Sequence, residues 1–147
     1  MLSLKKFLKL KTYISIKLST STTNHYAVKM KINGKTGRFI LDTGASNTCI
    51  AISEAAYFKL NTTESKVKAT GAGTNNMPTL TSKKNKINIG KWKSNKASVI
   101  VIDLSHVNEA LANHSASTVS GILGADILKK GKAIIDYENH RLYLKQH

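Results

Sequence analysis

Asp42, Thr43 and Gly44 form the stretch of the sequence with the clearest potential for chemistry. They follow the apolar run at 38–41 directly, in the sequence RFILDTGAS, so a carboxylate stands at the end of a segment that otherwise suits burial. The chain holds only eight Asp and Glu against 23 Lys and Arg. A carboxylate activates water when its pKa and position are controlled. Gly44 permits a tight turn that would hold Asp42 in place.

The tripeptide alone is a weak signal, because Asp42 could equally be an ordinary turn or cap residue. Its context is more specific. A Gly-rich stretch, ATGAGTNN, follows at residues 69–76, and the apolar element Ile122-Leu123-Gly124 lies further along the chain. This combination of elements is more specific than the tripeptide alone and favours a catalytic role for Asp42 over a plain turn.

The elements that must position Asp42 are mostly short strands. Alternating apolar residues at 26–32 and the run at 38–41 flank the turn signal NGKTG and predict a hairpin. Further strands are expected at 13–18, 97–102 and 121–123, with a terminal hairpin at 132–145. Residues 65–90 resemble a long exposed hairpin. Helices are expected at 103–114, at 125–131 and over a short stretch starting at Ser53. The sequence therefore predicts one mostly-β domain over residues 1–147, with the basic extension 1–24 as part of it.

Composition narrows the partners and the compartment. The net charge of +15 comes almost entirely from lysine, since only Arg38 and Arg141 are arginine. Lysine-rich surfaces are usually solvated, whereas arginine reads phosphates and bases, so nucleic acid is not the expected partner. Cys49 is the single cysteine and can form no intrachain disulfide, which favours a reducing compartment such as the cytoplasm. Neither a signal peptide nor a membrane-spanning segment is expected, and no membrane partner.

Four elements in this order resemble the retropepsin-like aspartic proteases, and the cellular and bacterial members more than the viral ones. FILDTGAS is similar to their catalytic strand and loop, and ATGAGTNN to their flap. GILGADIL is similar to their second apolar-Gly motif, and AIIDYENHRLYL to their terminal hairpin. The resemblance spans residues 26–144. It implies a closed β-barrel-like acid-protease domain with short helices.

The resemblance also implies a mechanism and an assembly. Asp42, Thr43 and Gly44 would form the catalytic loop, and the chain has no second Asp-Thr-Gly, so an active enzyme would be a homodimer. The two Asp42 carboxylates would share a proton and activate water for hydrolysis of a peptide or polyprotein substrate. Neither cofactor nor metal is expected. The flap would hold the substrate, through Thr70, Gly71, Ala72 and Gly73. The catalytic loop would be supported by Ala45, Ile122, Leu123 and Gly124.

Departures from the family pattern leave alternatives open. Ala45 stands where pepsin-like enzymes have Ser or Thr donating to the outer carboxylate oxygen, so a pH optimum nearer neutral is expected. Asp126 would either steady a dimer or cap the following helix. The inserted helix at 103–114 would cover the dimer edge, contact substrate or hold the chain monomeric. The alternative function is a non-catalytic peptide-binding or scaffolding module of the same fold.

Structural roles are expected for the remaining conspicuous side chains. Cys49 is expected to be a small buried hydrophobic residue in a strand, and Trp92 a packing residue. His106 and His114 are expected to be surface residues of the inserted helix. The histidines are too scattered along the sequence to suggest a metal site.

Overall fold

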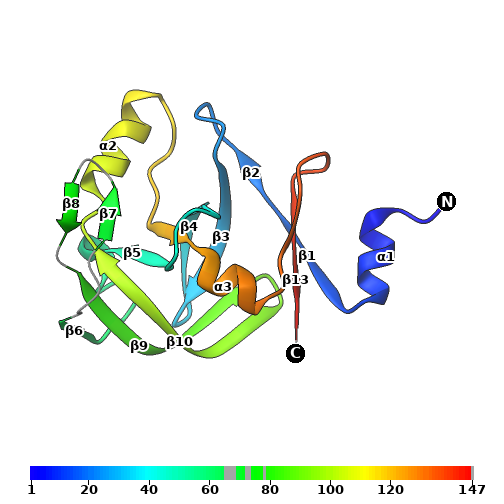
Figure 1. The fold of residues 1–147 in the computed structure, drawn as a ribbon, viewed down its shortest axis with the longest axis horizontal. Coiled ribbons are helices and arrows are strands. Elements are labelled where there is room, and N and C mark those ends of the chain that lie inside the picture. Colours follow the sequence, from blue (N-terminus) through cyan, green and yellow to red (C-terminus); the bar gives the residue numbers. More distant parts are fainter. Residues whose placement is uncertain (65–68, 72–73, 78, 147) are drawn as a thin grey trace.

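The computed structural model describes residues 1–64, 69–71, 74–77 and 79–146, which fold mainly into short strands with a few helices (Figure 1). Six strands close into a barrel in the order β3-β4-β11-β5-β10-β9, because β3 also pairs with β9. The expected closed β-barrel-like fold is confirmed. The barrel strands are β3 (Tyr26–Ile32), β4 (Lys35–Leu41), β5 (Cys49–Ala51), β9 (Leu80–Ile89), β10 (Trp92–Ile102) and β11 (Gly121–Leu123).

The hairpin of β3 and β4 forms where the sequence predicted one. Its two-residue loop, Asn33 and Gly34, has positive φ at both positions, 51° and 84°, as a tight turn between twisted strands requires. Ile32 pairs with Lys35 across the turn. Apolar residues of β3 point into the barrel and lysines point outward, so the expected hairpin is confirmed.

The barrel interior is the main hydrophobic core. Phe39, Ile50 and Leu123 come from the strands around Asp42 and are fully buried. Trp92 is also buried, and its indole N–H donates to the Lys145 carbonyl at 3.1 Å. This hydrogen bond ties the barrel to the C-terminal strand and confirms the packing role expected for Trp92.

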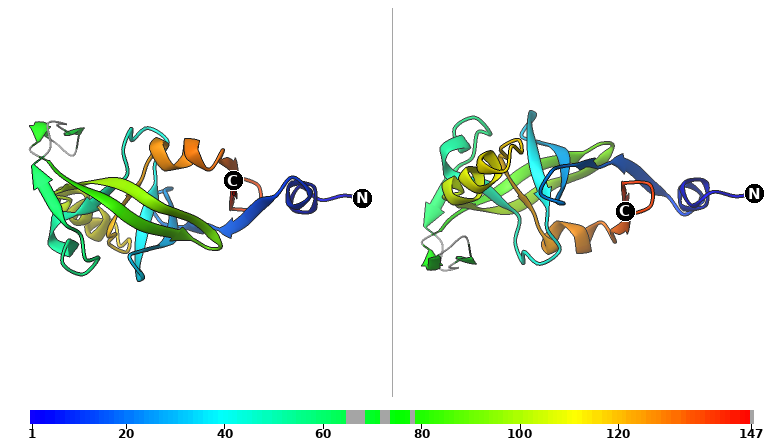
Figure 2. Two further views of the ribbon diagram at one scale, coloured as in Figure 1. Left: turned by 90° about the horizontal axis from the view of Figure 1, so that it is seen from below. Right: turned by 90° about the horizontal axis from the view of Figure 1, so that it is seen from above.

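A second, three-stranded sheet lies beside the barrel. Its order is β1-β13-β12, formed by β1 (Tyr13–Lys17), β13 (Arg141–Lys145) and β12 (Ile134–Asp136). The terminal hairpin of β12 and β13 is thereby confirmed. The chain then crosses from β1 into the main sheet through β2 (Ser19–Thr20), which pairs with β3. Helix α1 (Leu4–Leu10) lies at the far end of the molecule (Figure 2).

Helices α2 (Ser105–Asn113) and α3 (Ala125–Lys130) confirm two of the three expected helices. The helix expected from Ser53 is wrong. Only a single 3-10 turn forms (Ile52–Glu54), without a side-chain cap, and turns follow it. Lys59 adopts a positive φ of 56°, which ends any helix there, and the turns bury Phe58 completely in the core. None of the helices in the described ranges is both long and apolar enough to span a membrane.

The region expected to form the flap is only partly described. Strands β6 (Thr62–Glu64), β7 (Ala69–Gly71) and β8 (Thr74–Met77) flank it; β6 pairs with β9, and β7 pairs with β8. Both views place β7 and β8 at the end of the molecule opposite α1 (Figures 1 and 2). Thr70 and Gly71 therefore lie in β7, whereas Ala72 and Gly73 are outside the described residues.

Candidate active site

Asp42 is placed by pairing between distant parts of the chain. Strands β4 and β11 run parallel, with Leu41 beside Leu123. The pairing continues one residue further, since the Asp42 N–H donates to the Leu123 carbonyl at 3.0 Å. Asp42 is half-buried at the point where the buried strand reaches the surface. The element that the sequence marked at Ile122-Leu123 is thus the direct neighbour of the Asp42 strand.

The loop after Asp42 is folded back on the carboxylate. The Gly44 N–H donates to Asp42 Oδ1 at 2.9 Å, and the Ala45 N–H donates to the Asp42 carbonyl at 3.2 Å. Thr43 and Gly44 are exposed. The carboxylate is therefore oriented by the Gly44 N–H of its own loop, while the loop faces outward, where another molecule can approach it.

Gly124 packs against the underside of this loop. A Cβ at this position would stand 2.7 Å from the carbonyl carbon and oxygen of Asn47, and 2.9 Å from the Ala45 oxygen. The next residue, Ala125, donates its N–H to the same Ala45 oxygen at 2.7 Å. Only glycine fits this contact without moving backbone, so the loop and the start of α3 form one rigid unit.

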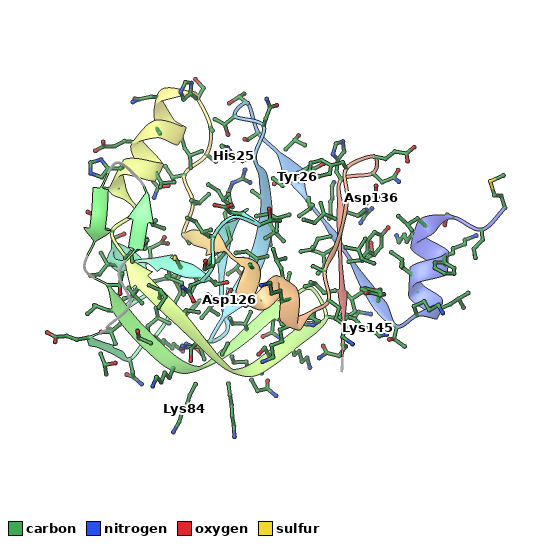
Figure 3. The ribbon with its side chains drawn as sticks, viewed as in Figure 1. His25, Tyr26, Lys84, Asp126, Asp136 and Lys145 are labelled. Carbon is green, nitrogen blue, oxygen red and sulfur yellow. The ribbon has the colours of Figure 1, made fainter. Side chains whose placement is uncertain are left out.

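A buried hydroxyl and the Asp126 carboxylate strengthen this unit, and their pairing was not foreseen from the sequence. Thr48 is fully buried; its hydroxyl donates to Asp126 Oδ1 at 2.8 Å and accepts from the Gly124 N–H at 3.0 Å. The Thr48 N–H also donates to both Asp126 oxygens at 3.0 Å. Figure 3 labels Asp126 at α3. Within the chain, Asp126 thus links α3 to the segment after the Asp-Thr-Gly loop, while Gly124 stands at the N-cap position.

Cys49 follows Thr48 and is confirmed as a small buried residue. Its thiol donates to the Asn47 carbonyl at 3.3 Å. Burial raises the pKa of the Cys49 thiol to about 11, and the negative charges of Asp126 and Asp42 add to the effect. The thiol therefore stays protonated at neutral pH and does not supply a nucleophile.

A pocket of about 790 Å³ opens beside Asp42. Ile40 and Ile122, from the paired strands β4 and β11, line it next to the carboxylate. Val107 and Leu111 of α2 form one wall. The loop between β2 and β3, which carries His25 (Figure 3), contributes to the other. A largely apolar pocket next to a carboxylate suits an apolar side chain held near a reacting bond.

Hydrogen bonds fix α2 over this pocket. Asn108 donates to the Val119 carbonyl at 3.1 Å and accepts from the Val119 N–H at 2.8 Å. Thr22 donates its hydroxyl proton to the His114 carbonyl at 2.8 Å, which ties the far end of α2 to the β2–β3 loop. Leu111 and Val119 pack with Ile40 in a small buried cluster. The inserted helix is therefore a built wall of the pocket.

Three histidines that are distant in sequence meet this one pocket. His25, His106 and His114 all line it, and each is exposed. The surface position expected for His106 and His114 is confirmed, but their common pocket was not foreseen, because the sequence gives no sign that residues 22–25 face α2. No cluster of metal-binding side chains occurs among the residues that the structure describes.

Sequence comparison places the chain among the aspartyl proteases. The model of the aspartyl protease family matches residues 28–127, which include the Asp-Thr-Gly loop, the 69–77 region and the second apolar-Gly motif. The match covers more than half of the chain, so the chain belongs to this family. None of the curated proteins matches the sequence.

Solved structures show the same fold. A retropepsin-like aspartic protease from Rickettsia conorii is 22% identical, with a TM-score of 0.57 over 91% of this chain and 89% of that one. The EIAV protease in complex with the inhibitor HBY-793 is 19% identical, with a TM-score of 0.54 over 75% and 90%. The retroviral protease-like domain of Ddi1 from Leishmania major is 16% identical, with a TM-score of 0.55 over 80% and 86%. The fold is thus that of the retropepsins.

Proposed function

We propose that the chain is an aspartic endopeptidase that hydrolyses peptide bonds as a homodimer, with one Asp-Thr-Gly loop from each subunit. The observation that carries the proposal is the position of Asp42: half-buried, held by the Gly44 N–H, on an outward-facing loop beside a largely apolar pocket. Family membership supports the same reaction. Asp42, Thr43 and Gly44 are the proposed catalytic loop.

The chemistry requires two carboxylates, and this chain offers one such loop. Two aspartates about 3 Å apart cannot both ionise, so they share a proton and titrate as a pair. The ionised carboxylate of the pair accepts a proton from water as the water attacks the scissile carbonyl. The protonated carboxylate donates a hydrogen bond to the carbonyl oxygen. Because Thr43 and Gly44 are exposed, the loop surface is free to meet its copy.

Substrate binding is assigned to the surfaces around the loop. The pocket formed by Ile40, Ile122 and α2 takes a side chain adjacent to the scissile bond. Of the three roles open to the inserted helix, substrate contact is the one that its position beside Asp42 supports. Residues 70–73 remain the proposed flap, and Ala45, Leu123 and Gly124 the proposed support of the catalytic loop. A cytoplasmic location stays a prediction from the single cysteine.

The test is cleavage of a mixed peptide library between pH 3 and pH 8 by the wild-type chain and by the Asp42→Asn variant. We expect cleavage by the wild type and a loss of at least about a thousandfold in the variant, as for removal of other catalytic groups. Asp103→Asn is the matched control, since it removes an exposed carboxylate outside the site while an amide oxygen can still accept from the Ser105 N–H.

Sedimentation of the same samples separates the two candidate functions. A dimer that cuts, with a dimeric but inactive Asp42→Asn variant, supports the endopeptidase. A monomer that binds peptides without cutting them would instead establish the peptide-binding module. Equal activity of wild type and Asp42→Asn would refute the assignment of Asp42.

A further inference from the structure

A second, larger groove lies on another face of the molecule. Its volume is about 1240 Å³, and strands β1, β3, β4 and β9 line it. It shares no lining residue with the pocket beside Asp42. The groove runs over the outward face of the β3–β4 hairpin, where Lys29 and Lys31 point away from the core. The proposed peptidase reaction does not use this face.

The lining of this groove is strongly cationic. Lys29 stands directly opposite Arg38 in the antiparallel register of β3 and β4, and like charges in such pairs destabilise a sheet. Among the described residues, no acidic side chain lines the groove to offset them. The fold therefore maintains a concentration of positive charge that an anionic ligand would relieve. The cationic lining residues are Lys17, Lys29, Lys31, Arg38 and Lys86.

Two residues that line the groove carry a polar atom with unused hydrogen-bonding capacity. Arg38 Nε and Ser15 Oγ are buried, and within the described part of the chain neither finds a hydrogen-bond partner. Buried polar atoms normally have partners, so a small movement of either side chain that brings the atom to the groove surface would let a ligand satisfy it. The Arg38 guanidinium is held in place because its Nη1 donates to Ser19 Oγ at 3.2 Å. A guanidinium held in this way suits an oxyanion such as a carboxylate.

The border of the groove favours an extended polypeptide as the ligand. Ser15, Ile16 and Lys17 line it, and they belong to β1, the outer strand of the three-stranded sheet. An outer strand presents backbone N–H and C=O groups to which an extended segment can add as a further strand. The described residues that line the groove include no aromatic side chain on which a single-stranded nucleic acid could stack. A second copy of this chain would bring its own charge of +15 against the lysines.

We propose that this groove binds an acidic, extended segment of a polypeptide at a site separate from Asp42. Carboxylates of the segment pair with Lys29, Lys31 and Arg38, and its backbone lies along β1. Binding at this site needs no catalysis, so it is tested independently of the proposed peptidase function.

The experiment uses the full chain carrying Asp42→Asn, which prevents cleavage of the probe. Fluorescence anisotropy measures binding of a labelled oligo-glutamate peptide, with oligo-glutamine of equal length as the uncharged control. The groove variant is Lys29→Gln with Lys31→Gln. The matched control is Lys84→Gln with Lys93→Gln, which removes the same charge from exposed lysines outside the groove; Figure 3 shows Lys84 projecting from β9 into solvent.

We expect oligo-glutamate to bind and oligo-glutamine not to. The groove variant should bind oligo-glutamate about 3- to 10-fold more weakly, as two exposed ion pairs warrant, and the control variant should match the parent. Urea unfolding of both variants establishes that the loss is not a folding defect.

Three results would overturn the proposal. Equal weakening in the groove and control variants would show attraction by the overall charge alone. Binding of an oligothymidine that is lost in the groove variant, with no binding of oligo-glutamate, would identify a nucleic-acid site. A change of sedimentation in the groove variant without any peptide binding would identify an interface between copies of this chain.

Discussion

The hydroxyl of Thr48 should be essential to the rigidity of the proposed catalytic loop, and a matched pair of substitutions isolates it. Thr48→Val keeps the shape of the side chain but removes the hydroxyl. Thr48→Ser keeps the hydroxyl and removes one methyl group. Both hydrogen bonds of the hydroxyl, to Asp126 and from the Gly124 N–H, are lost only in the valine variant.

The size of the effect follows from these two bonds. A buried N–H without a partner costs about 1–3 kcal/mol, and a lost hydrogen bond to a charged group about 1.5–3 kcal/mol. Asp126 retains the Thr48 and Ile127 N–H donors, so the lower half of the combined range applies. We expect Thr48→Val to lose roughly 2–4 kcal/mol of unfolding free energy. Thr48→Ser should lose roughly 1 kcal/mol, for the buried methyl group.

Urea denaturation followed by fluorescence measures both variants, and comparison of their m-values confirms that the same unfolding transition is compared. In the peptide assay Thr48→Val should also lose about ten- to a hundredfold in kcat/KM, because small displacements of a reacting group are costly. If the unfolding free energies of the Val and Ser variants agree within about 0.5 kcal/mol, the bridging role of the hydroxyl is refuted.

Four further predictions address the loop, the pocket and the buried thiol. Gly124→Ala should lose at least about tenfold in kcat/KM, because the new Cβ would collide with backbone atoms of the catalytic loop. In the control variant Gly34→Ala the Cβ meets no atom within 4 Å, but the residue keeps a φ of +84°, so only the unfolding free energy should fall. Ala45→Ser should move the acidic limb of the pH–rate profile to lower pH, because a new donor favours the ionised carboxylate; an unmoved limb would contradict this. Ala110→Trp should fill the pocket beside Asp42 and reduce kcat/KM most for peptides with large apolar residues at the scissile bond; a uniform reduction would argue against a side-chain pocket. With its pKa at about 11, the Cys49 thiol is ionised in only about one molecule per thousand at pH 8, so iodoacetamide should react roughly a hundredfold faster after unfolding in urea, and equal rates would be incompatible with its burial.

Most strands and helices could be predicted from local patterns in the sequence. The β3–β4 hairpin was predictable because alternation and an Asn-Gly turn are both short-range signals. Helix α2 was predictable from apolar residues at helical spacing. The helix expected from Ser53 does not form because tertiary packing overrides the local pattern. Lys59 has a positive φ, and the turns that precede it place Phe58 in the core.

The surroundings of Asp42 were only partly predictable. The Asp-Thr-Gly loop and the Gly124 motif were predicted to lie together because the family resemblance assigned one as the catalytic loop and the other as its support. The Thr48–Asp126 bridge and the meeting of His25 with α2 depend on barrel closure, which brings residues together without any local signature. The cationic groove is invisible in the sequence for the same reason, because it needs the register of Lys29 with Arg38 and the position of β1.

The parallel pairing of β4 with β11 also governs when the site can exist during synthesis. Gly124 and Thr48, which join across the loop, are 76 residues apart along the chain. Asp42 therefore leaves the ribosome long before the segment that fixes it has been translated. Contacts of such long sequence separation form late in folding. A nascent chain consequently carries the aspartate without its support, and the site forms only when most of the protein has been made.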